Sequence, residues 1–117
     1  MSQEGGFTNY NYKAVEVIES VKVLKDVNSK KSTNLPERSN TPDTKYISLT
    51  KDNAIKQMRE YDSNRKPKVD IDFDHSHNGV KPHIHTYKNG ERNDGRALTK
   101  TEEKKYGKIL KAAEDRK

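Results

Sequence analysis

VDIDFDHSHNGVKPHIHTY, residues 69–87, is the stretch that decides the expected fold. Its beginning, residues 69–74, alternates apolar with acidic side chains, which is the two-residue period of a strand with one buried face. Asn78-Gly79 is the dipeptide most typical of a two-residue hairpin turn, and residues 82–87 supply a return strand. The sequence therefore predicts an antiparallel hairpin.

A two-residue turn at Asn78-Gly79 would fix which side chains lie opposite each other. Opposed Cβ atoms in such a pair are about 4.5–5.5 Å apart. The register therefore predicts carboxylates beside imidazoles on the outer, solvent-facing side of the sheet. The expected pairs are Phe73 with Ile84 on the inner face, and Asp74 with His83 and Asp72 with His85 on the outer face.

The C-terminal region predicts a helix that covers one face of this sheet. Thr99 with Glu102 three residues later is a capping-box pattern at a helix start. A stripe of apolar side chains at helical spacing follows it. The stripe consists of Tyr106, Ile109, Leu110 and Ala113.

The N-terminal region is harder to interpret. Residues 13–27 carry apolar groups at helical spacing, which favours a further helix, although their valines would also suit a strand. Residues 28–45 contain two prolines and few apolar groups, which is typical of a flexible linker. The expected strands are 46–50, 55–62, 69–74 and 82–87.

The expected fold class is therefore α+β. A small antiparallel sheet of three to four strands would carry a C-terminal helix packed on one face. Residues 1–45 would form an N-terminal arm, with its helix at 13–27 and its linker at 28–45. Residues 46–117 would form the domain that bears the histidines.

Composition narrows the classes of function. Apolar residues make up 28% and charged residues 36% of the chain, which predicts a thin core. The net charge of +6 favours polyanionic partners, and the absence of cysteine excludes disulfides, thiolate metal sites and cysteine nucleophiles. We expect no membrane span, because no apolar run approaches about 20 residues.

The histidines point to acid–base chemistry. All four of them, His75, His77, His83 and His85, fall between residues 75 and 85. A neighbouring carboxylate favours the charged imidazole, and a hydrogen bond to one ring nitrogen fixes the proton on it. Cleavage of RNA needs little more than an acid, a base and cations on the phosphate, because the 2′-hydroxyl of the substrate is the nucleophile.

The hypothesis gives each polar side chain a role. His83 and His85 are the expected acid and base, His75 and His77 support them, and Asp72 and Asp74 orient the imidazoles. The expected phosphate-binding residues are Lys81, Tyr87, Arg92 and Arg96.

Two alternatives remain open for the same side chains. Asp72, Asp74, His83 and His85 offer two oxygens and two nitrogens, a ligand set that suits zinc or another divalent ion. The aspartates and histidines could also be an exposed pair of polar strand faces without a functional role. We prefer metal-free acid–base catalysis, without a cofactor, over the metal site.

Residues 59–92 carry a series of motifs in a recognisable order. These are Tyr61-Asp62, Asp70-Ile71-Asp72, His75, Pro82-His83-Ile84-His85, Tyr87 and Gly90-Glu91-Arg92. The series resembles the C-terminal toxin domains of bacterial polymorphic and contact-dependent toxins, some of which are prophage-associated.

The resemblance implies a nuclease toxin that acts on RNA after secretion or delivery into the cytoplasm of a target cell. It also implies a dedicated, acidic immunity protein as a partner. We therefore expect a metal-independent endoribonuclease. The alternative is a non-catalytic, cytoplasmic accessory protein of a phage or mobile element that binds nucleic acid, a metal ion or a protein partner.

Overall fold

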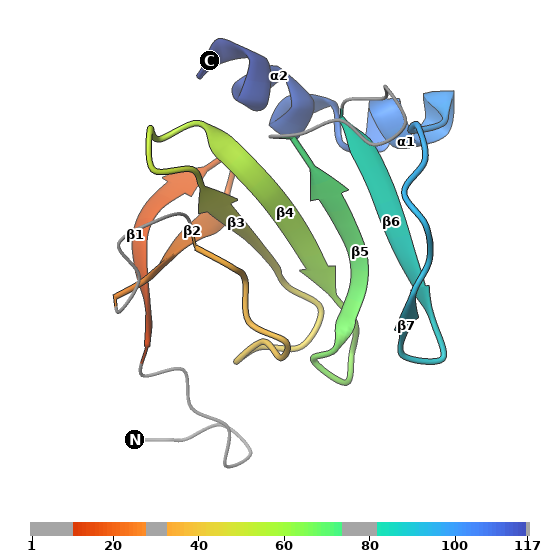
Figure 1. Cartoon of the computed structure of the whole chain (residues 1–117), viewed down its shortest axis with the longest axis horizontal. Coiled ribbons are helices and arrows are strands. Elements are labelled where there is room, and N and C mark those ends of the chain that lie inside the picture. The colour runs from red at the N-terminus through yellow and green to blue at the C-terminus, as the bar shows by residue number, and fades with distance from the viewer. Residues whose placement is uncertain (1–10, 28–32, 74–81, 117) are drawn as a thin grey trace.

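The computed structural model describes residues 11–27, 33–73 and 82–116, and these form one seven-stranded sheet with two short helices (Figure 1). The strands lie side by side in sequence order. Every neighbouring pair is antiparallel except β2 and β3, which are parallel. The strands are β1 Tyr12–Ile18, β2 Val21–Asp26, β3 Lys45–Leu49, β4 Ile55–Tyr61, β5 Pro67–Asp72, β6 His83–Lys88 and β7 Glu91–Arg92; the helices are α1 Lys100–Lys105 and α2 Gly107–Asp115.

The expected sheet of three to four strands is therefore wrong, and so is the expected helix at 13–27. Residues 12–26 form the β1–β2 hairpin, with positive φ angles at Glu19 and Ser20 in its turn. β-Branched valines favour strands, and pairing places Val21 and Val23 in the core at 8% and 1% exposure. Residues 13–27 contain both a helical and a strand pattern, and the burial of these valines favours the strand.

Residues 33–44, the described part of the connection between the parallel strands β2 and β3, include a segment that packs on one face of the sheet. Leu35, within this connection, is buried beside Tyr61. The Tyr61 hydroxyl donates to the Pro36 carbonyl at 2.6 Å, and Arg59 donates to the carbonyls of Leu35 and Pro36. The described part of the expected linker thus covers the sheet.

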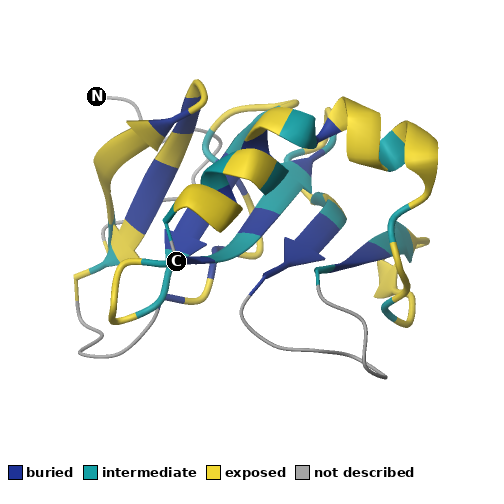
Figure 2. Cartoon of the chain, turned by 90° about the horizontal axis from the view of Figure 1, so that it is seen from above, coloured by how far each residue is buried: buried dark blue, intermediate teal, exposed yellow. Residues whose placement is uncertain are grey.

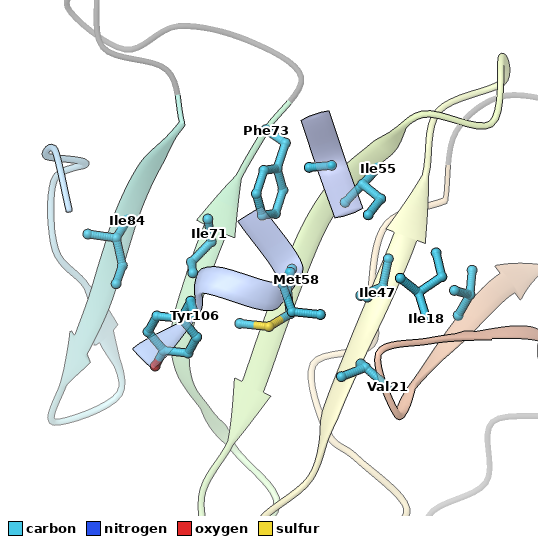
Figure 3. Close-up of a cluster of buried hydrophobic side chains, with 12 residues drawn as sticks. Ile18, Val21, Ile47, Ile55, Met58, Ile71, Phe73, Ile84 and Tyr106 are labelled. Carbon is cyan, nitrogen blue, oxygen red and sulfur yellow. The ribbon is translucent and has the colours of Figure 1, made fainter. Parts of the chain in front are cut away.

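The helices cover the opposite face, as the C-terminal stripe predicted. In Figure 3, Ile84, Ile71, Met58 and Ile47 lie across neighbouring strands, with Tyr106 beside Ile71 and Met58, and Figure 2 shows the largely exposed outer side of the helices. The capping box is confirmed: Thr99 Oγ1 accepts from the Glu102 amide, and Glu102 Oε1 accepts from the Thr99 amide. The buried set on this face is Ile18, Val21, Val23, Ile47, Ile55, Met58, Ile71, Phe73, Ile84, Tyr106, Ile109 and Ala113.

The register of the β5–β6 pair corrects the expected one by two residues. The expected partners of His83 and His85, which were Asp74 and Asp72, are replaced by Asp72 and Asp70. Because two residues is one full period of a strand, every side chain keeps its expected face. The observed pairs are Asp72 with His83, Ile71 with Ile84 and Asp70 with His85.

A two-residue Asn-Gly turn does occur, one hairpin further on. Asn89 and Gly90, with φ of 52° and 82°, connect Lys88 to Glu91 in the β6–β7 hairpin. Positive φ at both central residues is the geometry for which Asn-Gly is favoured. The expected turn at Asn78-Gly79 lies outside the described residues.

Candidate functional site

The candidate site lies on the sheet face opposite the helices. Alternation along β5 and β6 places Asp70, Asp72, His83 and His85 on this face, while Ile71 and Ile84 point into the core. Arg59 from β4 and Arg92 from β7 contact the same carboxylates. We refer to Asp72, His83 and His85 as the Asp–His cluster.

One oxygen of Asp72 is the centre of the Asp–His cluster. Its Oδ2 lies 3.3 Å from His83 Nε2, 3.2 Å from His85 Nε2 and 3.1 Å from an Arg92 nitrogen. Its Oδ1 accepts a 2.8 Å hydrogen bond from the Gln57 amide. Burial raises the pKa of Asp72, but the Gln57 hydrogen bond and the nearby positive charge of Arg92 outweigh it, so the pKa is lowered and the carboxylate is ionised.

His85 lies between two hydrogen-bond acceptors. Its Nδ1 is 2.9 Å from the carbonyl oxygen of Asn93, and its Nε2 faces Asp72 Oδ2. A carbonyl can only accept, so Nδ1 carries a proton. If Nε2 carried neither a proton nor a bound ion, its lone pair would face the negatively charged oxygen of Asp72, which is unfavourable.

A second carboxylate, Asp70, lies next to the Asp–His cluster and is saturated with donors. Arg59 binds it through two contacts, at 2.7 and 3.0 Å, and Arg92 Nε lies 3.1 Å from it. The Tyr87 hydroxyl donates to it at 2.7 Å. Burial, and next the hydrogen bond to Asp70, raise the pKa of Tyr87 to about 12, so its hydroxyl stays protonated.

The two carboxylates and two imidazoles of the site are buried, which corrects the expectation of a solvent-facing surface. Asp70 is 0%, His83 1%, Asp72 5% and His85 7% exposed. The chain after β7 runs on along β6, with Ile84 and Arg96 paired, and Gly95 lies against both rings. An added Cβ on Gly95 would lie 2.6 Å from His83 Cδ2 and 2.8 Å from His85 Cε1.

The structure gathers some of the expected site residues and separates others. Asp72, His83, His85 and Arg92 converge, and Tyr87 joins them through Asp70. Arg96 pairs instead with Glu102 at 2.8 and 2.9 Å beside the helix cap. Four expected members, Asp74, His75, His77 and Lys81, lie outside the described residues.

Sequence reasoning missed several members of the site. Asp70 shares the alternation that singled out Asp72, and this pattern was sufficient to find it. Arg59 and Gln57 alternate correctly on β4 but carry no motif, and the register of β4 against β5 is needed to place them. Nothing in the local sequence links Gly95 to the histidines.

Comparison with protein-family models, with curated proteins and with solved structures gives no match to this chain. The resemblance to toxin domains therefore stays a prediction. Among the described residues, neither helix is long and apolar enough to cross a membrane.

Proposed function

We propose that the chain is an endoribonuclease in which His85 donates a proton to the leaving oxygen of RNA without the help of a metal. The observation that carries this is the position of His85 between the Asn93 carbonyl and the Asp72 carboxylate. Two acceptors favour the imidazole that is protonated on both nitrogens, and this form is a general acid.

The charges around His85 support a phosphate as ligand. Arg59 and Arg92 formally balance Asp70 and Asp72, so a doubly protonated His85 leaves the group with one excess positive charge. The side chain of Arg92 is 40% exposed, which makes it the group that meets a phosphate first.

The reaction then needs one proton from His85. The 2′-oxygen of the RNA attacks phosphorus and passes its proton to water, the bond from phosphorus to the 5′-oxygen breaks, and His85 Nε2 protonates that oxygen. His83, at 1% exposure, is a positioning residue that with Asp72 orients His85. Since Gly95 packs on the ring, RNA reaches Nε2 only when the segment around Gly95 moves.

Cleavage of end-labelled RNA by the full chain in EDTA tests this function. We expect His85→Gln to lower the cleavage rate by about a hundredfold or more, the usual contribution of a general acid. Arg92→Gln should lower it about tenfold to a hundredfold through lost stabilisation of phosphate charge. Lys111→Gln is the matched control, because it removes one positive charge from a side chain that is 78% exposed.

Intact RNA with the wild-type chain, or full activity in His85→Gln, would contradict the assignment. Delivery as a toxin and neutralisation by an acidic immunity protein belong to the same proposal and are supported by the motifs of residues 59–92 and the net charge of +6. Expression in a bacterial cytoplasm should therefore arrest growth with the wild-type chain and spare it with His85→Gln.

A further inference from the structure

We infer that the Asp–His cluster is a binding site for a divalent transition-metal ion, with zinc as the preferred ion, and that zinc bound there blocks proton donation by His85. The binding site stands on geometry alone, whereas the inhibition rests on the proposed function. Asp72, His83 and His85 each offer one ligand atom, and these atoms all lie within 4.8 Å of one another.

The distances from Asp72 Oδ2 to the two imidazole nitrogens also fit a shared ion. His83 Nε2 and His85 Nε2 lie 3.3 and 3.2 Å from Asp72 Oδ2. Zinc–ligand bonds of about 2.0–2.1 Å place neighbouring ligands of a tetrahedral ion about 3.3–3.4 Å apart.

The surrounding contacts orient the ligands as the outer contacts of a metal site do. The proton on His85 Nδ1 goes to the Asn93 carbonyl, which turns Nε2 toward the shared point. The Gln57 amide holds Asp72 Oδ1, which leaves Oδ2 for the ion. Hydrogen bonds of this kind fix the ring orientation and the basicity of metal-binding histidines.

Arg92 is the group that opposes the ion. Its guanidinium lies 3.1 Å from Asp72 Oδ2, the oxygen that would bind zinc. Two positive centres on one oxygen repel each other, but the Arg92 side chain is 40% exposed and can turn into solvent. Removal of this charge should therefore strengthen zinc binding, although the same change weakens the proposed RNA cleavage.

The ion would occupy the atom that the proposed reaction uses. A zinc–nitrogen bond takes the lone pair of His85 Nε2 in place of the proton, so the loaded protein has no proton to give at that position. Zinc should then inhibit RNA cleavage, and EDTA should restore it.

Titration calorimetry of the EDTA-treated and desalted full chain with zinc chloride tests the site. We expect one zinc ion per chain, with affinity reduced at least about tenfold in Asp72→Asn, His83→Gln and His85→Gln. Arg92→Gln should bind zinc several times more tightly than the wild type. Asp52→Asn, which removes an exposed carboxylate, should bind as the wild type does.

The double substitution His75→Gln/His77→Gln separates this site from the other two histidines and should leave one zinc bound. Histidine-ring NMR of the wild-type chain gives a readout that needs no variant to fold: zinc should shift the signals of His83 and His85. Absence of one-to-one binding, wild-type affinity in folded His83→Gln and His85→Gln, or shifts confined to His75 and His77 would overturn the site.

The two proposals fail in different ways. Zinc binding without any RNA cleavage by the metal-free chain would refute the nuclease and leave the site standing. Cleavage that is indifferent to zinc in a chain that binds none would refute the site alone. Activation by zinc would keep the site and overturn both the inhibition and the metal-free mechanism.

Discussion

Replacement of Gly95 by alanine tests whether the chain after β7 packs directly on the buried imidazoles. The new methyl would lie 2.6 Å from His83 Cδ2 and 2.8 Å from His85 Cε1. Ordinary carbon contacts are about 3.5–4.0 Å, so about 1 Å of overlap has to be relieved. Among the described residues Gly90 is the only glycine with positive φ, so the cost at Gly95 is steric.

Neither side of this contact yields easily. The rings are held at Asp72 on β5, and the Gly95 segment is held by the two backbone hydrogen bonds between Ile84 and Arg96, at 2.8 and 3.1 Å. Overpacking of a fixed site costs about 1–3 kcal/mol. We therefore expect Gly95→Ala to lower the free energy of unfolding by about 1–3 kcal/mol. Each kcal/mol lost should lower Tm by roughly 4–8 °C.

Urea unfolding followed by circular dichroism measures the effect, and two other glycines calibrate it. Gly107→Ala meets nothing within 4 Å at the start of α2 and should stabilise the chain by about 0.4–1 kcal/mol. Gly90→Ala also meets nothing but has φ of +82°, so it should cost about 1–2 kcal/mol through backbone strain alone. A Gly95→Ala chain within about 0.5 kcal/mol of wild type would refute the packing of this segment on the rings.

Three further substitutions test the charges of the fold. Arg59→Met should lower the free energy of unfolding in urea by about 3 kcal/mol, because Asp70 at 0% exposure loses two contacts of 2.7 and 3.0 Å. The double substitution Arg59→Met/Asp70→Asn should recover part of this loss. A loss under about 1 kcal/mol in Arg59→Met would show that Arg92 and Tyr87 are sufficient to stabilise the buried carboxylate of Asp70. Folding lowers the pKa of Glu102 from 4.5 to about 2, first through its hydrogen bond with Arg96, so its stabilisation is present above pH 4.5 and fades as the pH falls toward 2. Glu102→Gln should flatten the pH dependence of Tm in that acid range, and an unchanged profile would contradict the role of this cap. Burial and Asp70 raise the pKa of Tyr87 from 10.0 to about 12, so its stabilisation is present below pH 10 and is lost as the pH rises toward 12; the phenolate absorbance missing in Tyr87→Phe should develop near pH 12, and its appearance near pH 10 would contradict the buried hydrogen bond.

The sequence could predict which face of a strand each side chain occupies. Alternation in residues 69–74 and 82–87 placed Ile71, Phe73 and Ile84 in the core, and all three are buried. The capping box at Thr99 located the helix start, because its two reciprocal hydrogen bonds depend only on residues three apart. Local patterns with a single physical cause were the reliable ones.

The N-terminal region could not be predicted because two periods coexist in it. Residues 13–27 satisfy a helix and a strand hairpin, and the choice depends on a distant partner: β2 pairs with β3 through Lys22 with Tyr46 and Val23 with Ile47. A parallel pairing between strands joined by a long connection gives no recognisable sequence pattern in either strand. The strands β1 and β2 were missed for this reason, whereas β7 is only two residues long.

The composition of the candidate site was predictable although the register was wrong, because strand pairing tolerates errors of two residues but not of one. The slip replaced Asp74 with Asp72 opposite His83 and Asp72 with Asp70 opposite His85, so acids still face imidazoles. The burial of the site was not predictable from the sequence. A polar strand face is exposed to solvent only where no other segment of the chain packs on it. The edge of β6 offers unpaired backbone groups, residues 93–96 satisfy them, and Gly95 is the residue small enough to lie over two rings. The buried imidazoles are thus a consequence of satisfying a sheet edge, and any chemistry at His85 depends on how firmly that edge is held.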